Sequence, residues 1–363
     1  MKLADRVIDL AIQIQQIPAP TFGEAERAEF VRALFDSEGL ADVSVDALGN
    51  VFARLPGIKD GKPLIISAHT DTVFPLDTDL RLSRGPGLVH GPGLGDNSLG
   101  VAALSGLSWM LRERRIELGG DVWFVANACE EGLGNLLGMK AVVDRFGSDV
   151  QAYLVLEGLA LGHVYHRAAG VKRYRVTART EGGHSWSDYG KPSAIHALSK
   201  LIGELTSLEL PGHPRTTMNV GKISGGTSIN VIAAEAWLEL DLRSEGQESL
   251  AELVSAVDAI IDNGNKPQVK MEAEMIGQRP AGEMDANHPL IKLAEACLRE
   301  QGIEAVLTSG STDANIPLSR GYPALVLGVS TGGGAHTLNE FIHTAPIEKG
   351  LEQLVRFVEK VMQ

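Results

Sequence analysis

The sequence predicts an α/β fold in which a large domain, built on a helix-covered sheet, is interrupted by a smaller α+β domain. Two observations predict it. Short, fully apolar runs alternate with helical patterns in the outer parts of the chain, whereas the middle contains strands with one apolar and one polar face. The 363 residues, 44% of them hydrophobic, suffice for two cores. We expect a discontinuous large domain over residues 1–167 and 280–363, and an inserted domain over residues 168–279.

The large domain is expected to contain four short strands that are buried on both faces. Each run is apolar and is bounded by polar or glycine-containing turns, which is typical of central strands in a sheet covered by helices. A helical pattern over Leu99–Leu111 lies between the first two runs, and a terminal helix is expected over Ile347–Val361. The four predicted strands are Pro63–Ala68, Asp121–Asn127, Ala152–Leu156 and Ala324–Gly328.

The inserted domain has a different pattern, because its strands alternate between apolar and polar residues. In the run Ala234–Arg243, aliphatic residues occupy one face and mostly charged residues the other. The order of elements is β-α-β-β-α-β, which is the ferredoxin-like arrangement, so one face of the sheet is expected to meet solvent or a partner. The other predicted strands are Val171–Ala178, Thr216–Ile223 and Val269–Met275, with helices over Ile195–Leu205 and Leu250–Ile261.

Composition and charge argue against several classes of function. The formal net charge is −13 and no basic stripe is present, which disfavours nucleic acid as a partner because phosphate binding requires clustered lysines and arginines. No apolar run approaches the ~20 residues of a membrane helix, and residues 1–15 fit an amphipathic helix better than a secretory signal. Cys129 and Cys297 lack the spacing of a metal site, so we expect reduced thiols in a cytoplasmic protein.

Residues of the types that bind metals follow the predicted strands at the points where these strands end. Ligands of an open α/β sheet bind beyond the carboxyl ends of its strands, so residues far apart in sequence are expected to converge there. Imidazole and carboxylate groups suit zinc, and several carboxylates in a small space favour a second cation because they otherwise repel one another. The residues are His69, Asp71, Glu130, Glu131, Glu157 and His336, together with Asp96 in a glycine-rich loop.

Five short motifs around these residues resemble those of a known enzyme family. They are SAHTDTV at Ser67–Val73, GLGDN at Gly93–Asn97, CEEG at Cys129–Gly132, LEG at Leu156–Gly158 and GAHTLNE at Gly334–Glu340. Over essentially its whole length the sequence resembles the co-catalytic metallopeptidases that include carboxypeptidase G, peptidase T, aminoacylase, acetylornithine deacetylase and succinyl-diaminopimelate desuccinylase. The resemblance implies a mixed-sheet zinc-peptidase catalytic domain, with an inserted ferredoxin-like domain for dimerisation and as a lid.

The resemblance also implies a set of metal ligands. Asp96 is expected to bridge two divalent metal ions, with His69 and Glu157 completing one site and Glu131 and His336 the other. Zinc is the expected metal, and cobalt or manganese would also suit these ligands. A cis peptide bond is expected directly after Asp96.

Further roles are implied for residues outside the ligand set. Glu130 is expected to act as general base and acid, and Asp71 to accept a hydrogen bond from the far ring nitrogen of His69. His184 is expected to reach across a homodimer interface to the partner's site, with an exposed loop histidine as the alternative. Asn230 and Arg243 match positions that contact substrate, and the alternative for Arg243 is a solvated strand end.

Three functions remain open from the sequence. The leading hypothesis is an exopeptidase that cleaves short peptides, and the alternative is an N-acyl amino acid deacylase, since both reactions hydrolyse an amide bond. A metal-binding homologue without catalysis is the third, and the presence of Glu130 disfavours it. The pair Asn97-Ser98 stands where desuccinylases have a Met-Lys-type sequence, which weakens that particular assignment.

Overall fold

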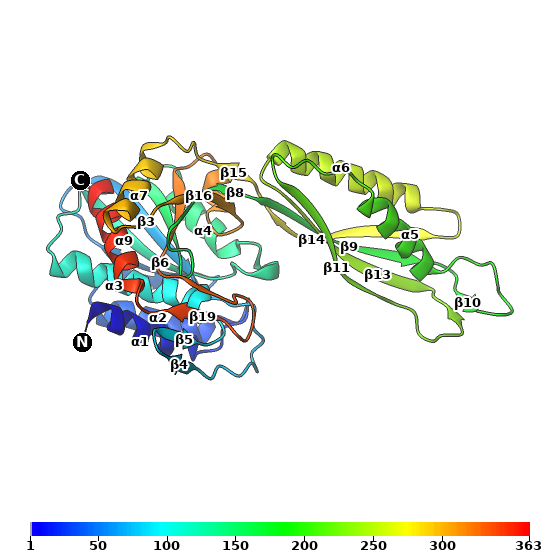
Figure 1. Ribbon diagram of the computed structural model, residues 1–363, viewed down its shortest axis with the longest axis horizontal. Coiled ribbons are helices and arrows are strands. Elements are labelled where there is room, and N and C mark those ends of the chain that lie inside the picture. The colour runs from blue at the N-terminus through cyan, green and yellow to red at the C-terminus, as the bar shows by residue number, and fades with distance from the viewer. Residues whose placement is uncertain (1) are drawn as a thin grey trace. The chain divides into compact units, whose positions relative to one another are not determined.

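The computed structural model describes residues 2–363 and divides the chain into two compact units. Unit 1 comprises Met1–Ala168 and Glu283–Gln363, and unit 2 comprises Ala169–Gly282. The boundaries expected from the sequence lie within a few residues of these divisions. Each unit has its own hydrophobic core. The helices and strands of both units are labelled in Figure 1. Within the described residues, no helix combines the length and the hydropathy needed to cross a membrane.

Unit 1 is an α/β structure built on a mixed sheet of nine strands. The four central strands β6, β3, β7 and β17 run parallel to one another, and antiparallel strands flank them on both sides. The central strands are buried on both faces, which explains their apolar sequences. In order along the sheet, the strands are β1 (Ala41–Val45), β2 (Val51–Leu55), β6 (Gly120–Asn127), β3 (Gly61–His69), β7 (Ala152–Glu157), β17 (Ala324–Gly328), β8 (His163–Ala168) and β15 (Gly282–Glu283), and β16 (Val306–Gly310) pairs with β8.

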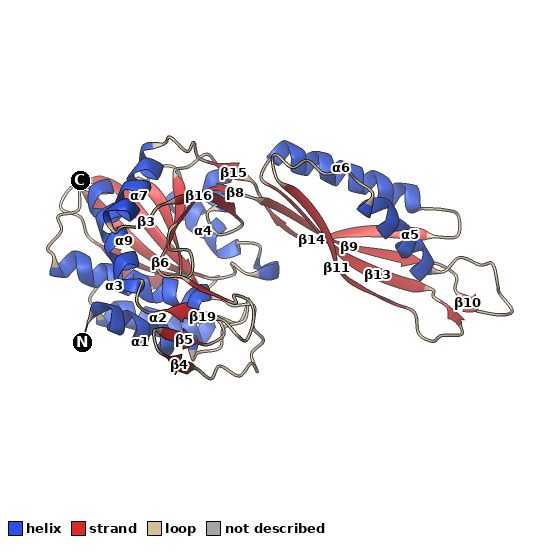
Figure 2. Cartoon of the chain, in the orientation of Figure 1, coloured by secondary structure: helices blue, strands red, loops and turns tan. Residues whose placement is uncertain are grey.

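Helices cover both faces of this sheet. The connections from β3 through α3 to β6 and from β6 through α4 to β7 move in opposite directions across the sheet, so right-handed crossovers place α3 and α4 on opposite faces (Figures 1 and 2). The helix α9 packs on α3 and α7 through an apolar stripe that contains Leu354 and Val358. The helices are α1 (Leu3–Gln15), α2 (Ala25–Ser37), α3 (Leu99–Glu113), α4 (Leu137–Phe146), α7 (Pro289–Glu300), α8 (Asn315–Ser319) and α9 (Ile347–Val361), with short helical turns η1 (Leu94–Ser98) and η2 (Gly132–Gly134).

The parallel strands end at the same edge of the sheet, as the register shows. His69, the last residue of β3, is opposite Asn127, the last residue of β6. Glu157, the last residue of β7, is opposite Gly328, the last residue of β17. A small second sheet supports the loops beyond this edge, and its strands are β18 (Gly332–Gly333), β19 (Phe341–His343), β5 (Leu88–His90) and β4 (Ser83–Gly85).

Unit 2 consists of a four-stranded antiparallel sheet with two helices on one face. Its elements follow the order β-α-β-β-α-β, and the sheet order is β11-β13-β9-β14. Alternate residues of β13, among them Leu238, Leu240 and Leu242, are buried against the helices. The elements are β9 (Gly170–Arg179), α5 (Ala194–Thr206), β11 (Thr216–Gly225), β13 (Glu235–Ser244), α6 (Gln247–Gly264) and β14 (Lys270–Arg279), with β10 (Gly183–His184) paired to β12 (Val231–Ile232).

The edge strand β14 differs from the sequence expectation. The alternation of Val269, Met271, Ala273 and Met275 predicted one continuous buried face, yet only Met271 is fully buried and Met275 is 48% exposed. The pairing of β14 with β9 shifts between Met275 and Gly277. This shift comes after Met275, so it does not account for the exposure of the residues before it. β14 is an edge strand of the described sheet and pairs only with β9, so its side chains have a neighbouring strand on one side alone.

Candidate metal centre

The five predicted metal ligands lie together at the carboxyl edge of the sheet of unit 1. Asp96 lies between two histidines, with Oδ1 3.1 Å from Nε2 of His69 and Oδ2 3.0 Å from Nε2 of His336. On the first side, Glu157 Oε2 is 3.9 Å from Nε2 of His69. On the second side, Glu131 Oε1 is 3.1 Å from Nε2 of His336. Each oxygen of Asp96 is therefore associated with one histidine and one glutamate.

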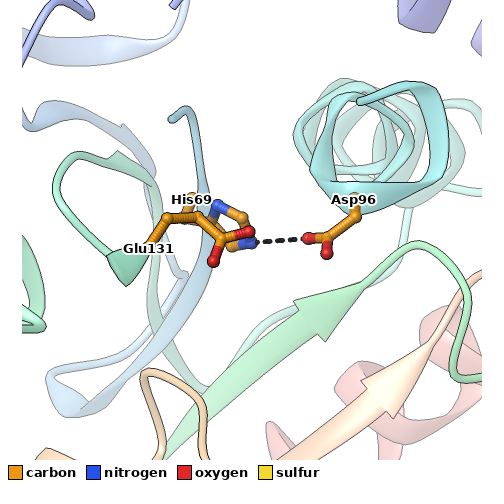
Figure 3. A group of neighbouring side chains, drawn as sticks. All are labelled: His69, Asp96 and Glu131. Atoms are coloured by element: carbon orange, nitrogen blue, oxygen red, sulfur yellow. Dashed lines mark ion pairs between the residues drawn. The ribbon is translucent and has the colours of Figure 1, made fainter. Parts of the chain in front are cut away.

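Different elements carry these side chains to one place. His69 ends β3, Asp96 lies in η1, and Glu131 follows β6, yet ligand atoms of these three residues lie within 4.8 Å of one another (Figure 3). Glu157 ends β7, and His336 lies in the loop between β18 and β19. The common edge at which the parallel strands end explains how residues so distant in sequence meet.

The charges of the cluster strongly perturb the two histidines. Burial favours neutral His69, but hydrogen bonds with Asp71 and Asp96 and the charges of Glu157 and Glu130 raise its pKa well above the usual value. Hydrogen bonds with Asp96 and Glu131 raise the pKa of His336 to about 10. Without a metal, His336 is therefore positively charged at neutral pH, and the neighbouring acids shift His69 towards the same charged form.

The carboxylates are perturbed in opposite directions. Burial opposes ionisation of Asp96, but the hydrogen bonds from His336 and His69 prevail and lower its pKa. Glu157 has no such compensation, so burial and the neighbouring charges of Asp96 and Glu130 raise its pKa well above the usual value despite the nearby His69. Protons thus offset the negative charge that a divalent cation would neutralise.

The donor set fits two divalent cations. Its two imidazole nitrogens and three carboxylates are the borderline ligands that zinc accepts, and only Asp96 has an oxygen directed to each histidine. His69 and Glu157 could complete one site and Glu131 and His336 the other. Backbone approach is close here: a Cβ at Gly158 would lie 2.0 Å from the Gly95 carbonyl, so a glycine after Glu157 is required to bring that strand end to the Asp96 loop.

Asp71 lies behind the cluster and holds the loop that follows β6. Its carboxylate accepts the backbone N–H groups of Glu130 and Glu131, both at 2.9 Å, and the hydroxyl of Thr21 at 2.9 Å. Nδ1 of His69 is 3.1 Å from the Asp71 carbonyl oxygen and 3.5 Å from its carboxylate. The carbonyl is thus the nearer acceptor of the two, and a hydrogen bond to either one would leave Nε2 directed at Asp96.

Glu130 is buried beside the five ligands, with 5% of its surface exposed. Its charge raises the pKa values of both His69 and Glu157, which places its carboxylate within electrostatic reach of the first side of the cluster. The backbone N–H of Glu130 donates to Asp71, so the residue's backbone is fixed.

Asn97 and Glu340, which belong to the sequence motifs but have no role predicted from the sequence, hold the Asp96 loop in place. The peptide bond between Asp96 and Asn97 is cis, as expected. The Asn97 side chain donates to the Leu156 carbonyl at 2.8 Å and accepts the Gly158 N–H at 3.0 Å, which ties the loop to the end of β7. Glu340, which is fully buried, accepts backbone N–H groups from the same loop.

Two charged residues near α2 hold the strand ends from behind and were not singled out from the sequence. The guanidinium of Arg27, almost fully buried, donates to the carbonyl oxygens of Thr70 and Ile17, and burial lowers its pKa to about 10. Glu24 accepts the backbone N–H of Cys129 at 3.0 Å. Their buried roles could not be predicted from the helical pattern, because charged residues on an amphipathic helix normally face solvent.

The three candidates in unit 2 fall into two places. His184 and Asn230 are neighbours, because β10 pairs with β12 and the N–H of Ser185 donates to the Asn230 carbonyl at 3.0 Å. Nδ1 of His184 lies 3.2 Å from the Trp186 N–H, and both candidate side chains are exposed. Arg243 lies on β13, where its Nε donates to Oδ2 of Asp241 at 2.6 Å.

The fold and this arrangement of residues agree with a comparison against known families. The chain belongs to peptidase family M20/M25/M40, whose model matches residues 65–360. It is a metal-dependent hydrolase that acts on amide bonds.

Individual relatives include both peptidases and a deacylase. The succinyl-diaminopimelate desuccinylase of Corynebacterium glutamicum is 25% identical, over 96% of this chain and 93% of the relative. Among solved structures, a tripeptidase of Staphylococcus aureus has a TM-score of 0.84 with 23% identity and covers 99% of this chain and 98% of its own. The YXEP protein of Bacillus subtilis, described as a dinuclear metal binding peptidase, has a TM-score of 0.71 with 18% identity, over 99% and 98% of the two chains.

Metal binding is expected to release protons. Because hydrogen bonds raise the pKa of His336 to about 10 in the metal-free protein and also raise that of His69, and because imidazole ligands must be neutral, zinc should displace at least one proton at pH 7. Calorimetric titration of metal-free protein with zinc in PIPES and in HEPES, which differ in ionisation enthalpy, measures this release. Equal binding enthalpies in the two buffers would contradict it.

Proposed function

We propose that the protein is a two-metal exopeptidase that cleaves short peptides with a metal-activated water. The observation that carries this proposal is the position of Asp96, which offers one oxygen to each of two histidine–glutamate pairs. Zinc is the proposed metal, because two imidazoles and three carboxylates are ligands that it accepts. The YXEP protein is described as a dinuclear metal binding peptidase, and this description agrees with the two cations proposed here.

The chemistry is divided between the cations and the protein. Two bound cations would polarise the scissile carbonyl and lower the pKa of a water. Glu130 accepts the proton of this water and delivers it to the leaving amine, a role that suits a buried carboxylate within reach of the cluster. Asp71 accepts the backbone N–H groups of Glu130 and Glu131. These bonds fix the backbone position of the proton acceptor, Glu130, relative to that of the proposed ligand Glu131.

A deacylase remains the second candidate, and exposed apolar residues beside the cluster favour substrates with an apolar group. Phe22, Leu133 and Leu338 are 64%, 54% and 65% exposed. Leu133 and Leu338 each lie two residues after a proposed ligand, hence within about 7 Å of it along the chain. Such side chains could contact either an apolar residue of a peptide or the acyl chain of an N-acyl amino acid.

We further propose that unit 2 is a ferredoxin-like domain that forms a homodimer and serves as a lid. Its β-α-β-β-α-β order and its sheet order support the fold. Trp186, Tyr189 and Ile229 are 87%, 89% and 102% exposed around the β10–β12 pair, and apolar exposure of this size favours an interface. His184, on the same pair, would then stabilise the developing oxyanion in the partner's site.

Asn230 and Arg243 are proposed substrate contacts. Asn230 is exposed next to His184, so both would meet the same substrate. The guanidinium of Arg243 suits a substrate carboxylate. It would have to bind this carboxylate in addition to Asp241, to which it already donates a hydrogen bond. A cytoplasmic location is proposed on the two buried, unpaired cysteines.

A substrate panel distinguishes peptidase from deacylase activity. We expect zinc-loaded protein to cleave free di- and tripeptides with apolar residues faster than N-acetyl and N-succinyl amino acids, and a chelator to abolish the cleavage. Mass spectrometry of the products gives the end at which the enzyme acts. Turnover of the acylated compounds alone would assign the protein to the deacylases.

Replacement of Glu130 tests the catalytic assignment. Glu130→Gln is expected to lower kcat by at least about 100-fold, because general acid–base catalysis typically contributes this much, while two metals still bind. Glu304→Gln, at an exposed position, is the matched control and should retain wild-type turnover. Near wild-type kcat for Glu130→Gln would remove the residue from the mechanism.

Mixed dimers test whether His184 acts in the partner's site. Glu130→Gln and His184→Ala homodimers should both be nearly inactive. A mixed dimer, purified with two different affinity tags, combines intact Glu130 from one chain with intact His184 from the other. One of its two sites is then complete, and about half the wild-type activity should return. A mixed dimer as inactive as its parents, or a protein that sediments as a monomer, would contradict the role.

A further inference from the structure

We propose that Glu340 is a positioning residue that fixes Asp96 relative to His336, and thereby builds the metal site formed by Asp96, His336 and Glu131. The inference rests on the two-metal function proposed above. Among the described residues, the hydrogen bonds to the Glu340 carboxylate come from the backbone of the loop that carries Asp96, so Glu340 acts through that backbone.

The carboxylate of Glu340 accepts hydrogen bonds from three backbone N–H groups of this loop. Oε2 accepts the Gly93 N–H at 2.9 Å, and Oε1 accepts the N–H groups of Gly95 at 2.6 Å and Asp96 at 2.9 Å. Glu340 is fully buried, so no water competes for these bonds. A buried carboxylate is costly unless donors compensate it, and these three amides offset only part of the cost, since burial still raises the pKa of Glu340 to about 7.

Glu340 belongs to the same short loop as His336. The loop is folded on itself by the bonds from the N–H of Thr337 to the Gly334 carbonyl at 3.0 Å and from the N–H of Glu340 to the Thr337 carbonyl at 3.2 Å. The Glu340 carbonyl in turn accepts the Gly91 N–H at 2.9 Å. One residue thus joins the His336 loop to the Asp96 loop through both its side chain and its backbone.

The two ends of the Asp96 loop are anchored to different halves of the cluster. On the carboxyl side, Asn97 binds Leu156 and Gly158, the residues on either side of Glu157. On the amino side, Glu340 binds the loop to the segment of His336. Loss of Glu340 should therefore release Asp96 from His336 while the anchor next to Glu157 remains, and the two metal sites should respond unequally.

Calorimetric titration of metal-free protein with zinc tests this inequality without relying on activity. Wild type is expected to bind two ions. In Glu340→Gln the amide NH2 faces backbone N–H donors, so one site should weaken at least about 10-fold, as outer-shell substitutions at metal sites do, while the other changes less than about 3-fold. Glu340→Asp retains the charge but is one methylene shorter, so its loss should be intermediate. Glu304→Gln is the matched control.

Kinetics provide the second readout. Reduced occupancy of one site should lower kcat of Glu340→Gln more than it raises KM, and excess zinc should recover much of the loss. Unchanged binding at both sites, or equal weakening of both, would overturn the inference, and circular dichroism shows whether the fold persists. If Glu340→Gln does not fold, unchanged zinc binding by Glu340→Asp would overturn it equally. Wild type that binds fewer than two ions would instead overturn the proposed function, and the inference with it.

Discussion

Mutual repulsion among carboxylates is the constraint on which the rest of this structure depends. Asp96, Glu130, Glu131 and Glu157 lie at one edge of the sheet, and only His69 and His336 offer positive charge among them. Like charges at such short distances repel one another, which favours separation of the loops that carry them. The fold supplies a restraint outside the cluster, by binding the loops through their backbones.

Three buried carboxylates provide this restraint in the same chemical manner. Glu24 accepts the N–H of Cys129, Asp71 those of Glu130 and Glu131, and Glu340 those of the Asp96 loop. Each bond uses a main-chain donor and leaves the ligand side chain free to face the centre. The arrangement adds further negative charge nearby, which the amide dipoles partly offset, and it explains why ligands from five separate segments occupy consistent positions.

The sequence predicted the central strands and the convergence of the ligand types well, because apolar runs and strand ends are local features with one physical interpretation. It could not predict the tertiary roles of Glu340 or Asn97, since a buried carboxylate and a solvated one look identical in sequence. The helices α2, α4, α7 and α8 were not predicted either. Of these, α2 buries the charged Arg27, and α8 is only five residues long. The exposure of Met275 was not predicted because the alternation of residues does not reveal that β14 is an edge strand.

The points at which unit 2 enters and leaves unit 1 have a consequence for how this architecture can be altered. The chain departs after β8 and returns in β15, which neighbours β8 in the sheet, and the N–H of Met284 donates to the His166 carbonyl at 2.8 Å. Two adjacent strand ends can be joined by a tight turn as easily as by a whole domain. The inserted unit thus joins two neighbouring strands, and we expect that a short turn in its place would retain the hydrogen bond between Met284 and His166.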